Sequence, residues 1–164
     1  MNPQQQTDKP YASSFKRLSD MKDHVGKELG LTEWVTITQE RINIFADATE
    51  DHQWIHVDPK MSAQNSPYKA TVAHGFLVLS LASKFTYETY TVDDVVMGVN
   101  YGLDRVRFPN ATVVGALLRG RVSLMSYAEK DGGARIKLSV VFELKGEEKP
   151  ACVAEFIGQA YTKQ

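Results

Sequence analysis

The sequence predicts an α+β fold in which one antiparallel sheet wraps round a long buried central helix. Residues 72–85 are apolar on nearly all sides and do not alternate with a period of two, which favours a helix over a strand. A helix that is apolar all round must be covered on all sides, and the later segments are rich in β-branched and aromatic residues. Hairpin-length gaps join those segments, so consecutive strands are expected to pair antiparallel.

The composition is that of a single-domain globular protein. The chain has 164 residues, of which 43% are hydrophobic and 24% are charged. A net charge of -1 provides no basic field, so we expect neither nucleic acid nor a membrane as a partner. No segment resembles a signal peptide or reaches the roughly eighteen apolar residues of a membrane span. The single cysteine, Cys152, fits a reducing compartment, and we expect a cytoplasmic protein.

The chain is predicted to begin with a disordered arm. Residues 1–14 are polar and contain two prolines, whereas residues 15–164 are expected to form one domain. Apolar residues spaced three and four apart predict a short amphipathic helix over residues 15–29. Residues 31–37 are then expected to form a strand, because they are rich in β-formers.

A second helix is predicted to start after Thr38. The Thr38 hydroxyl is a suitable N-cap, and Glu40 places a negative charge in the first turn, where it suits the helix dipole. Apolar residues at helical spacing follow from Ile42, so the helix is expected to run to about Ala48. One further helical turn is expected over residues 59–64.

The predicted sheet comes from five later segments with the composition of strands. The Asp131-Gly132 step between two of them is a strong hairpin signal. These expected strands cover residues 95–100, 103–108, 113–127, 134–145 and 151–161.

The second predicted helix leads into a run of acidic and imidazole side chains at residues 51–59, with the sequence DHQWIHVDP. Asp51 and His56 lie five residues apart, so they would diverge on a helix but can converge in a loop. Such a pair suits acid–base work on a water molecule. The structural alternative is that the histidine is solvated and that Asp51 ends a helix or forms a turn.

The same run also offers a rival metal site. Asp51, His52, His56 and Asp58 supply ligand types that metals accept. The two histidines would need helical i, i+4 geometry, and no cysteine or further acidic ligand completes a standard motif. We therefore expect no metal.

Four segments carry a family resemblance. They are the predicted helix 39–49, the run 51–58, Ala-His-Gly-Phe at 73–76 and Asn-Tyr-Gly-Leu-Asp-Arg-Val-Arg-Phe-Pro at 100–109. Together they resemble the MaoC-like dehydratases, which include the R-specific enoyl-CoA hydratases, and most closely the nodulation protein N-like branch. The resemblance covers about residues 31–161.

This resemblance implies a hotdog fold, with a homodimer and a pocket near the dimer interface. The implied reaction adds water to a trans-2-enoyl-CoA to give an R-3-hydroxyacyl-CoA, or removes it again, in fatty acid metabolism. No cofactor is implied, because coenzyme A is part of the acyl-CoA substrate.

The resemblance also implies roles for individual residues. Asp51 and His56 fall on the catalytic pair of the family, and Ser80 falls on a serine that lines its pocket. Gly75 falls on the glycine whose backbone N–H polarises the thioester carbonyl. A glycine at the start of a buried helix suits that task, because it permits close approach and the helix dipole favours an oxyanion.

The chain departs from the family pattern Gly-Asp-x-Asn-Pro-x-His at three positions. Glu50 replaces the glycine, Gln53 replaces the asparagine, and Trp54 replaces the proline. The spacing of the catalytic pair is kept. The departures put in doubt the shape of the loop and any role that the family asparagine has.

Further residues are candidates for substrate contact, each with a structural alternative. His74 at the helix start is more readily a cap or a hydrogen-bond partner of a site residue than a catalyst. Ser80 either lines the pocket or bonds back to a backbone carbonyl. Arg107 either meets the phosphates of the CoA arm or packs at a strand end. The expected substrate-binding residues are Gln53, Trp54, His74, Ser80, Asn100 and Arg107.

Two other functions are open to a chain with this architecture. A hotdog thioesterase would use a carboxylate on the central helix, but no acid lies between Val72 and Phe85. A non-catalytic acyl-thioester-binding subunit would not need the pair of Asp51 and His56, which is intact. The sequence leaves open the acyl chain length, the choice between CoA and acyl carrier protein, the direction, and which of the pair is the base.

Overall fold

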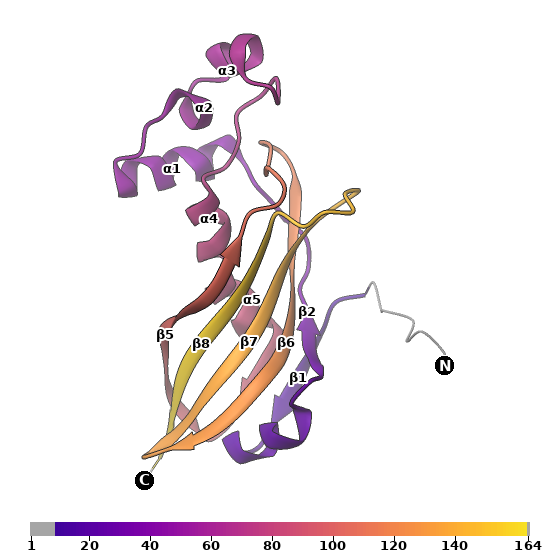
Figure 1. The fold of residues 1–164 in the computed structure, drawn as a ribbon, viewed down its shortest axis with the longest axis vertical. Coiled ribbons are helices and arrows are strands. Elements are labelled where there is room, and N and C mark those ends of the chain that lie inside the picture. Colours follow the sequence, from indigo (N-terminus) through magenta and orange to yellow (C-terminus); the bar gives the residue numbers. More distant parts are fainter. Residues whose placement is uncertain (1–8, 164) are drawn as a thin grey trace.

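The structure, a computed structural model, describes residues 9–163. One sheet of eight strands has the order β4-β1-β2-β6-β7-β8-β5, with β3 paired to β6. The long strands curve round the helices α4 (Gly75–Ser80) and α5 (Ala82–Thr89), as Figure 1 shows. This arrangement confirms the predicted α+β architecture, a sheet wrapped round buried helical segments.

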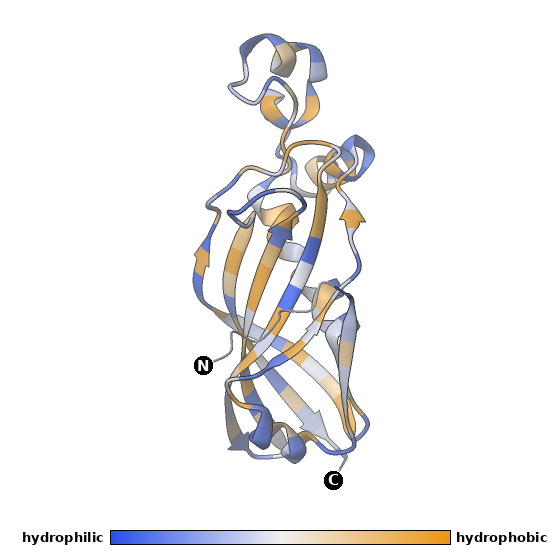
Figure 2. Cartoon of the chain, turned by 90° about the vertical axis from the view of Figure 1, so that its right-hand side faces the viewer, coloured by the Kyte–Doolittle hydropathy of each residue, from blue (hydrophilic) through white to orange (hydrophobic). Residues whose placement is uncertain are grey.

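Four long strands make most of the sheet: β5 (Val95–Arg107), β6 (Leu117–Lys130), β7 (Gly133–Leu144) and β8 (Cys152–Thr162). Buried and less buried residues alternate most regularly along β7, and Figure 2 shows bands of apolar and polar colour along the ribbons of the sheet. The alternation puts one set of side chains against the helices and leaves the other set on the outer face. In β7 the inward set is Ala134, Ile136, Leu138, Val140, Phe142 and Leu144, all of them buried.

The strand pairing confirms one part of the prediction and corrects another. The hairpin at Asp131-Gly132 is confirmed, with Lys130 opposite Gly133 and Gly132 at a φ of 75°. Strands β6, β7 and β8 pair consecutively and antiparallel, as expected. Strand β5 does not pair with β6, because it lies at the far edge against β8.

The two strands predicted at residues 95–100 and 103–108 are one strand, β5. A register shift between Asn100 and Gly102 interrupts its pairing with β8. A bulge of this kind disturbs the alternation of side chains, so one bent strand has the sequence pattern of two short ones.

The central helix starts later than predicted and is broken. Val72 forms a bridge with Val113, and the Ala73 N–H donates to the Thr112 carbonyl, so the predicted first turn is extended. Helices α4 and α5 then meet at Leu81. Their buried residues, including Val78 and Phe85, join the main core, which confirms that these helices pack inside the sheet. The expected cover on all sides is not found in the single chain, since Phe76 and Tyr87 are exposed. No helix among residues 9–163 is long and apolar enough to cross a membrane.

The helix predicted over residues 15–29 is wrong. The chain forms β1 (Tyr11–Phe15), the 3₁₀ helix η1 (Leu18–His24) and β2 (Glu28–Leu31). Phe15, Leu18, Met21 and Leu29 are nevertheless buried in the core. A 3₁₀ helix with three residues per turn places Leu18 and Met21 on one face, and this spacing also fits the first turn of an α-helix.

Two neighbouring predictions are also corrected. Part of the predicted arm, residues 11–14, belongs to β1, which pairs with β2 and in parallel with β4 (Tyr90–Val92). Residues 1–8 of that arm lie outside the described residues. The strand predicted over residues 31–37 is divided between the end of β2 and the short β3 (Val35–Thr36).

Three short helices stand beyond one end of the sheet (Figure 1). They are α1 (Gln39–Thr49), α2 (Trp54–Val57) and α3 (Pro59–Asn65). The predicted N-cap is confirmed, since the Thr38 side chain accepts a hydrogen bond of 3.2 Å from the Arg41 N–H. The extra helical turn predicted at residues 59–64 is α3. These helices carry the run of residues 51–59 to the start of α4.

Candidate active site

The loop that carries Asp51 is shaped by the residue before it. Glu50 ends α1 in the left-handed conformation, with φ 60° and ψ 19°. A glycine adopts this conformation readily, and the family pattern has glycine at this position. Glu50 therefore keeps the backbone turn that the pattern implies. The Asp51 Oδ1 accepts a hydrogen bond of 3.4 Å from the Gln53 N–H.

His56 has a defined orientation on α2. Its Nδ1 lies 2.6 Å from the Val72 carbonyl oxygen. A carbonyl can only accept, so Nδ1 carries the proton and the neutral ring has its lone pair on Nε2. Gln39 of α1 also holds the segment, because its side-chain amide donates to the His56 carbonyl oxygen at 2.8 Å.

His74 connects Asp51 to His56. Its ring is stacked on the His56 ring, with centroids 3.7 Å apart and an interplanar angle of 25°. Its Nε2 lies 2.9 Å from the Asp51 carbonyl oxygen and 3.9 Å from Asp51 Oδ2. The ring is 3% exposed and also contacts Phe45. The three side chains therefore form one cluster, although His74 is 23 residues from Asp51 in the sequence.

The cluster combines a solvent-facing carboxylate with partly buried imidazoles. Nitrogen and carboxylate oxygen atoms of Asp51, His56 and His74 lie within 4.8 Å of one another. The Asp51 side chain is 54% exposed, His56 is half-buried and His74 is buried. Burial lowers the pKa of His56 below its usual 6.5, and His74 adds to the lowering, whereas the Val72 hydrogen bond and Asp51 oppose it. The neutral imidazole is thus favoured.

Of the four residues considered as a rival metal site, Asp51 and His56 lie together, but His52 and Asp58 do not join them. His52 instead lies 2.8 Å from Asp47 Oδ1 on the exposed surface. Asp58 caps α3 by accepting a hydrogen bond of 2.9 Å from the Met61 N–H. Among the described residues, the potential ligands that do gather are those of the cluster with His74, where hydrogen bonds to carbonyls already occupy one nitrogen of each imidazole.

Gly75 is the first residue of α4 and directly follows His74. The first N–H groups of a helix have no partner within the helix, so the Gly75 N–H is free of the helical ladder. A Cβ at this position would lie 3.3 Å from the Phe108 ring. A larger side chain would therefore need Phe108 to move, so the glycine allows the Phe108 ring to pack against the start of α4.

The other predicted substrate contacts are spread over the molecule. The Ser80 hydroxyl donates to the Leu77 carbonyl at 2.7 Å, which is the structural alternative considered for it. Gln53 is exposed and Trp54 is half-buried beside the cluster. Arg107 is exposed and donates to the neighbouring Val106 carbonyl. Asn100 lines a separate cavity.

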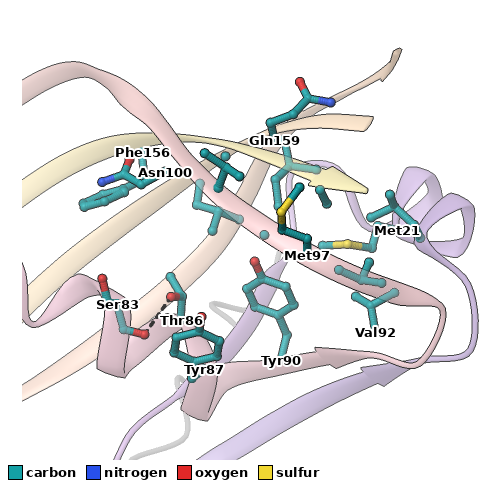
Figure 3. Close-up of a pocket in the computed structure, with 18 of the residues that line it drawn as sticks. Met21, Ser83, Thr86, Tyr87, Tyr90, Val92, Met97, Asn100, Phe156 and Gln159 are labelled. Carbon is teal, nitrogen blue, oxygen red and sulfur yellow. Dashed lines mark hydrogen bonds between the residues drawn. The ribbon is translucent and has the colours of Figure 1, made fainter. Parts of the chain in front are cut away.

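That cavity has a volume of about 480 Å³ and lies beneath the beginning of β5. Figure 3 shows Thr86 and Tyr87 of α5 on one side of it, and Asn100 and Phe156 from β5 and β8 on the other. No member of the Asp51, His56 and His74 cluster lines it. Sequence reasoning identified only Asn100 of its lining, because the cavity is made by elements that are distant in the sequence.

A large apolar surface adjoins both regions. One edge strand of the sheet is β5, and the exposed side of the central helices carries Phe76 and Tyr87, which are 73% and 81% exposed. The exposed apolar residues on β5 or directly after it are Val96, Met97, Val99, Tyr101, Leu103 and Phe108.

Comparisons with known proteins agree on one family. A family model described as "MaoC like domain" matches residues 20–143. The chain is 44% identical over 145 residues to the 3-hydroxyacyl-thioester dehydratase Z of Mycobacterium tuberculosis, covering 88% of this chain and 95% of that protein. It is 42% identical over 143 residues to nodulation protein N of Rhizobium leguminosarum, covering 85% and 88%.

Solved structures support the fold. The unliganded R-hydratase PhaJ1 from Pseudomonas aeruginosa matches with a TM-score of 0.73 and 17% identity, covering 91% of this chain and 88% of that chain. At this identity the likeness shows the hotdog fold alone. The resemblance noted in the sequence and the predicted fold are both confirmed.

Proposed function

The chain belongs to the MaoC-like domain family, a family of hydratases and dehydratases, and we propose that it is an R-specific enoyl-CoA hydratase. The reaction would add water to a trans-2-enoyl-CoA and give an R-3-hydroxyacyl-CoA, or run in reverse. The observation that carries this proposal is the convergence of Asp51 and His56, with the Nε2 lone pair of His56 left available.

In the proposed mechanism His56 is the base. As a water oxygen attacks C3, Nε2 takes a proton from that water, and the electron pair of the C2–C3 double bond moves to give an enolate. The protonated His56 then delivers its proton to C2, so the enzyme returns to its starting state. The second hydrogen of the water stays on the oxygen as the new 3-hydroxyl group, and the Asp51 carboxylate accepts a hydrogen bond from this O–H and stabilises the imidazolium.

Negative charge on the thioester oxygen needs a donor, and we assign this task to the Gly75 N–H. Its place at the start of α4, directly after His74, supports the assignment. An N–H that is not used by the helix can donate to the enolate oxygen at no reorganisation cost. The absence of a side chain lets the thioester approach the backbone.

We also propose that two copies complete the site. The outer edge of β5 has no partner strand among residues 9–163, and its apolar residues are exposed. A long apolar edge of this kind calls for cover, and a second copy related by a two-fold axis would pair β5 with β5 antiparallel. The exposed Phe76 and Tyr87 lie on the helices that would face the same partner.

This pairing would join the two regions described above. The cavity lies beneath the start of β5, whereas Phe108, directly after the end of β5, contacts the position of Gly75. Antiparallel pairing brings the start of one β5 beside the end of the other. An acyl chain held at the Asp51 and His56 of one copy would thus extend toward the apolar cavity of the second copy.

The test is hydration of crotonyl-CoA, measured as loss of the enoyl thioester absorbance with chiral analysis of the product. We expect the wild type to give the R-3-hydroxy product, and Asp51→Asn and His56→Ala to lose about 10²–10⁴-fold in turnover, as for a lost acid–base group. His52→Ala is the matched control, because His52 lies in the same run but pairs with Asp47 on the surface.

Three results bear against the proposal in different ways. Full activity in Asp51→Asn would remove the carboxylate from the mechanism. An S-3-hydroxy product would contradict the stereochemistry. A folded wild type that binds acyl-CoA but turns over no short or medium enoyl-CoA would instead indicate an acyl-thioester-binding subunit.

A further inference from the structure

His74 has no chemical step in the proposed reaction, yet it is the most buried member of the cluster. Its ring is 3% exposed, and its Nδ1 has no hydrogen-bond partner among the described residues. A buried polar atom without a partner costs free energy, so its presence needs an explanation. The explanation lies at the opposite edge of the same ring, where Nε2 meets Asp51.

The contact with Asp51 fixes the state of the His74 ring. The partner of Nε2 at 2.9 Å is a main-chain carbonyl, which can only accept, so Nε2 carries the proton. This bond holds the backbone of Asp51 rather than its carboxylate, whose Oδ2 lies 3.9 Å away. Asp51 follows the left-handed residue Glu50 in a loop, so its direction is not set by a helix or strand.

The contact with His74 also fixes the orientation of the His56 ring. The two rings are stacked with centroids 3.7 Å apart, while the Val72 carbonyl holds the Nδ1 edge of His56. These contacts leave the His56 ring little freedom to turn. His74 precedes α4 as its N-cap residue, and its carbonyl accepts the Val78 N–H, so the ring is anchored to the buried helix.

We propose that His74 is a positioning residue that makes Asp51 and His56 converge, by donating to the Asp51 main-chain carbonyl and stacking on the His56 ring. This inference rests on the proposed hydratase function. The unpartnered Nδ1 is explained by this role, because the ring orientation that lets Nε2 donate to Asp51 leaves Nδ1 buried without a hydrogen bond. Catalytic rates depend on such positioning, since a displacement of about 1 Å can cost about 10²-fold.

Two variants separate the hydrogen bond from the stack. His74→Phe keeps an aromatic ring against His56 but cannot donate to Asp51, and we expect kcat/KM to fall by up to about 10²-fold, mainly in kcat. His74→Gln places an amide donor near the position of Nε2 and removes the ring, and we expect it to keep activity within about tenfold of wild type.

His74→Gln should also change the pH dependence. Burial is the largest influence on the His56 pKa and lowers it, and His74 lowers it further, whereas the Val72 carbonyl and Asp51 raise it. Removing the imidazole should therefore move the acid limb of kcat/KM toward higher pH. If His74 had a structural role alone, its substitution would change the melting temperature but leave the pH midpoint of the acid limb of kcat/KM unchanged.

A measurement without turnover keeps the inference independent of the proposed reaction. The chain has four histidines, so long-range ¹H–¹⁵N spectra can be assigned with single substitutions. We expect the Nε2–H form for His74, the Nδ1–H form for His56, and a higher titration midpoint for His56 in His74→Gln. The opposite tautomer for His74 would overturn the inference whether or not the wild type hydrates enoyl-CoA.

The kinetic outcomes are likewise distinct. An inactive wild type would count against the proposed function, and the spectra would then decide the inference. Suppose that the wild type is active and that His74→Phe folds, keeps kcat/KM within twofold of wild type and has the same acid limb. This result would overturn the inference about His74 and leave the proposed function standing. If His74→Phe does not fold, His74→Gln is the deciding variant. The inference is overturned if His74→Gln leaves both the acid limb of kcat/KM and the titration midpoint of His56 unchanged.

Discussion

At the scale of single residues, the site depends on which nitrogen of each histidine faces which oxygen. The Val72 carbonyl binds Nδ1 of His56, and the Asp51 carbonyl binds Nε2 of His74. Both partners are main-chain carbonyls, so they cannot themselves titrate. The residue types Asp and His are visible in the sequence, whereas the available nitrogen is decided by carbonyls that lie 16 and 23 residues away.

The pH dependence of activity belongs to this scale. If neutral His56 is the base, kcat/KM should fall as pH decreases through its pKa, which burial lowers below 6.5. We expect the midpoint of the acid limb on crotonyl-CoA to lie below pH 6.5, with activity retained above it. His52→Ala should leave the midpoint unchanged. A midpoint above 6.5 in the wild type would show that the environment of His56 favours its charged form instead.

At the scale of elements, the central helix lies unusually close to the sheet. A Cβ on Gly120 of β6 would come within 2.4 Å of the Phe85 side chain on α5. Phe85 and Gly120 are both buried. The close approach of α5 to β6 therefore requires a residue without a side chain, and it sets the separation between the two layers.

We expect Gly120→Ala to destabilise the protein by about 1–3 kcal/mol, because the added methyl group overpacks the contact with Phe85. Urea denaturation followed by circular dichroism measures this difference. Gly102→Ala on β5 is the matched control, since a Cβ there meets nothing within 4 Å and should change the free energy of unfolding much less. Equal stability of the two variants would mean that α5 can shift on the sheet at little cost.

At the scale of the whole molecule, the candidate active site and the cavity lie apart within one copy. The cluster of Asp51, His56 and His74 stands at the end where the short helices gather, and the cavity lies beneath the beginning of β5. The exposed apolar edge of β5 runs between them. In the proposed homodimer, a second copy on this edge would cover the exposed apolar residues and bring a cavity to each cluster.

Val99→Asp tests that assembly. Val99 is an exposed residue of β5, and a charge there would be buried against the partner strand, so we expect the dimer to dissociate and the hydratase activity to fall. Light scattering coupled to size-exclusion chromatography gives the mass. Met125→Asp on β6 is the control, because Met125 is also exposed and apolar but lies away from the edge. A wild type that is monomeric and fully active would contradict the proposed homodimer.

Several features of the fold were predictable because their signals are local. The Thr38 cap, the Asp131-Gly132 hairpin and the alternating residues of β7 each depend on neighbours within a few positions. The helix predicted over residues 15–29 failed for the same reason. Spacings of three residues fit both an α-helix and a 3₁₀ helix, and the pairing of β1 with β2 and β4 decided between them.

The sequence by itself determined the family, the sheet round a buried helix, and the pair of Asp51 and His56 as the candidate catalytic residues. Tertiary structure alone decided that β5 pairs with β8, that the central helix breaks at Leu81, and that His74 joins the pair. The physical reason is the distance in sequence over which each interaction acts. Caps, turns and side-chain periodicity act over a few residues, whereas strand order, ring stacking and the choice of imidazole nitrogen depend on groups brought together only by the complete fold.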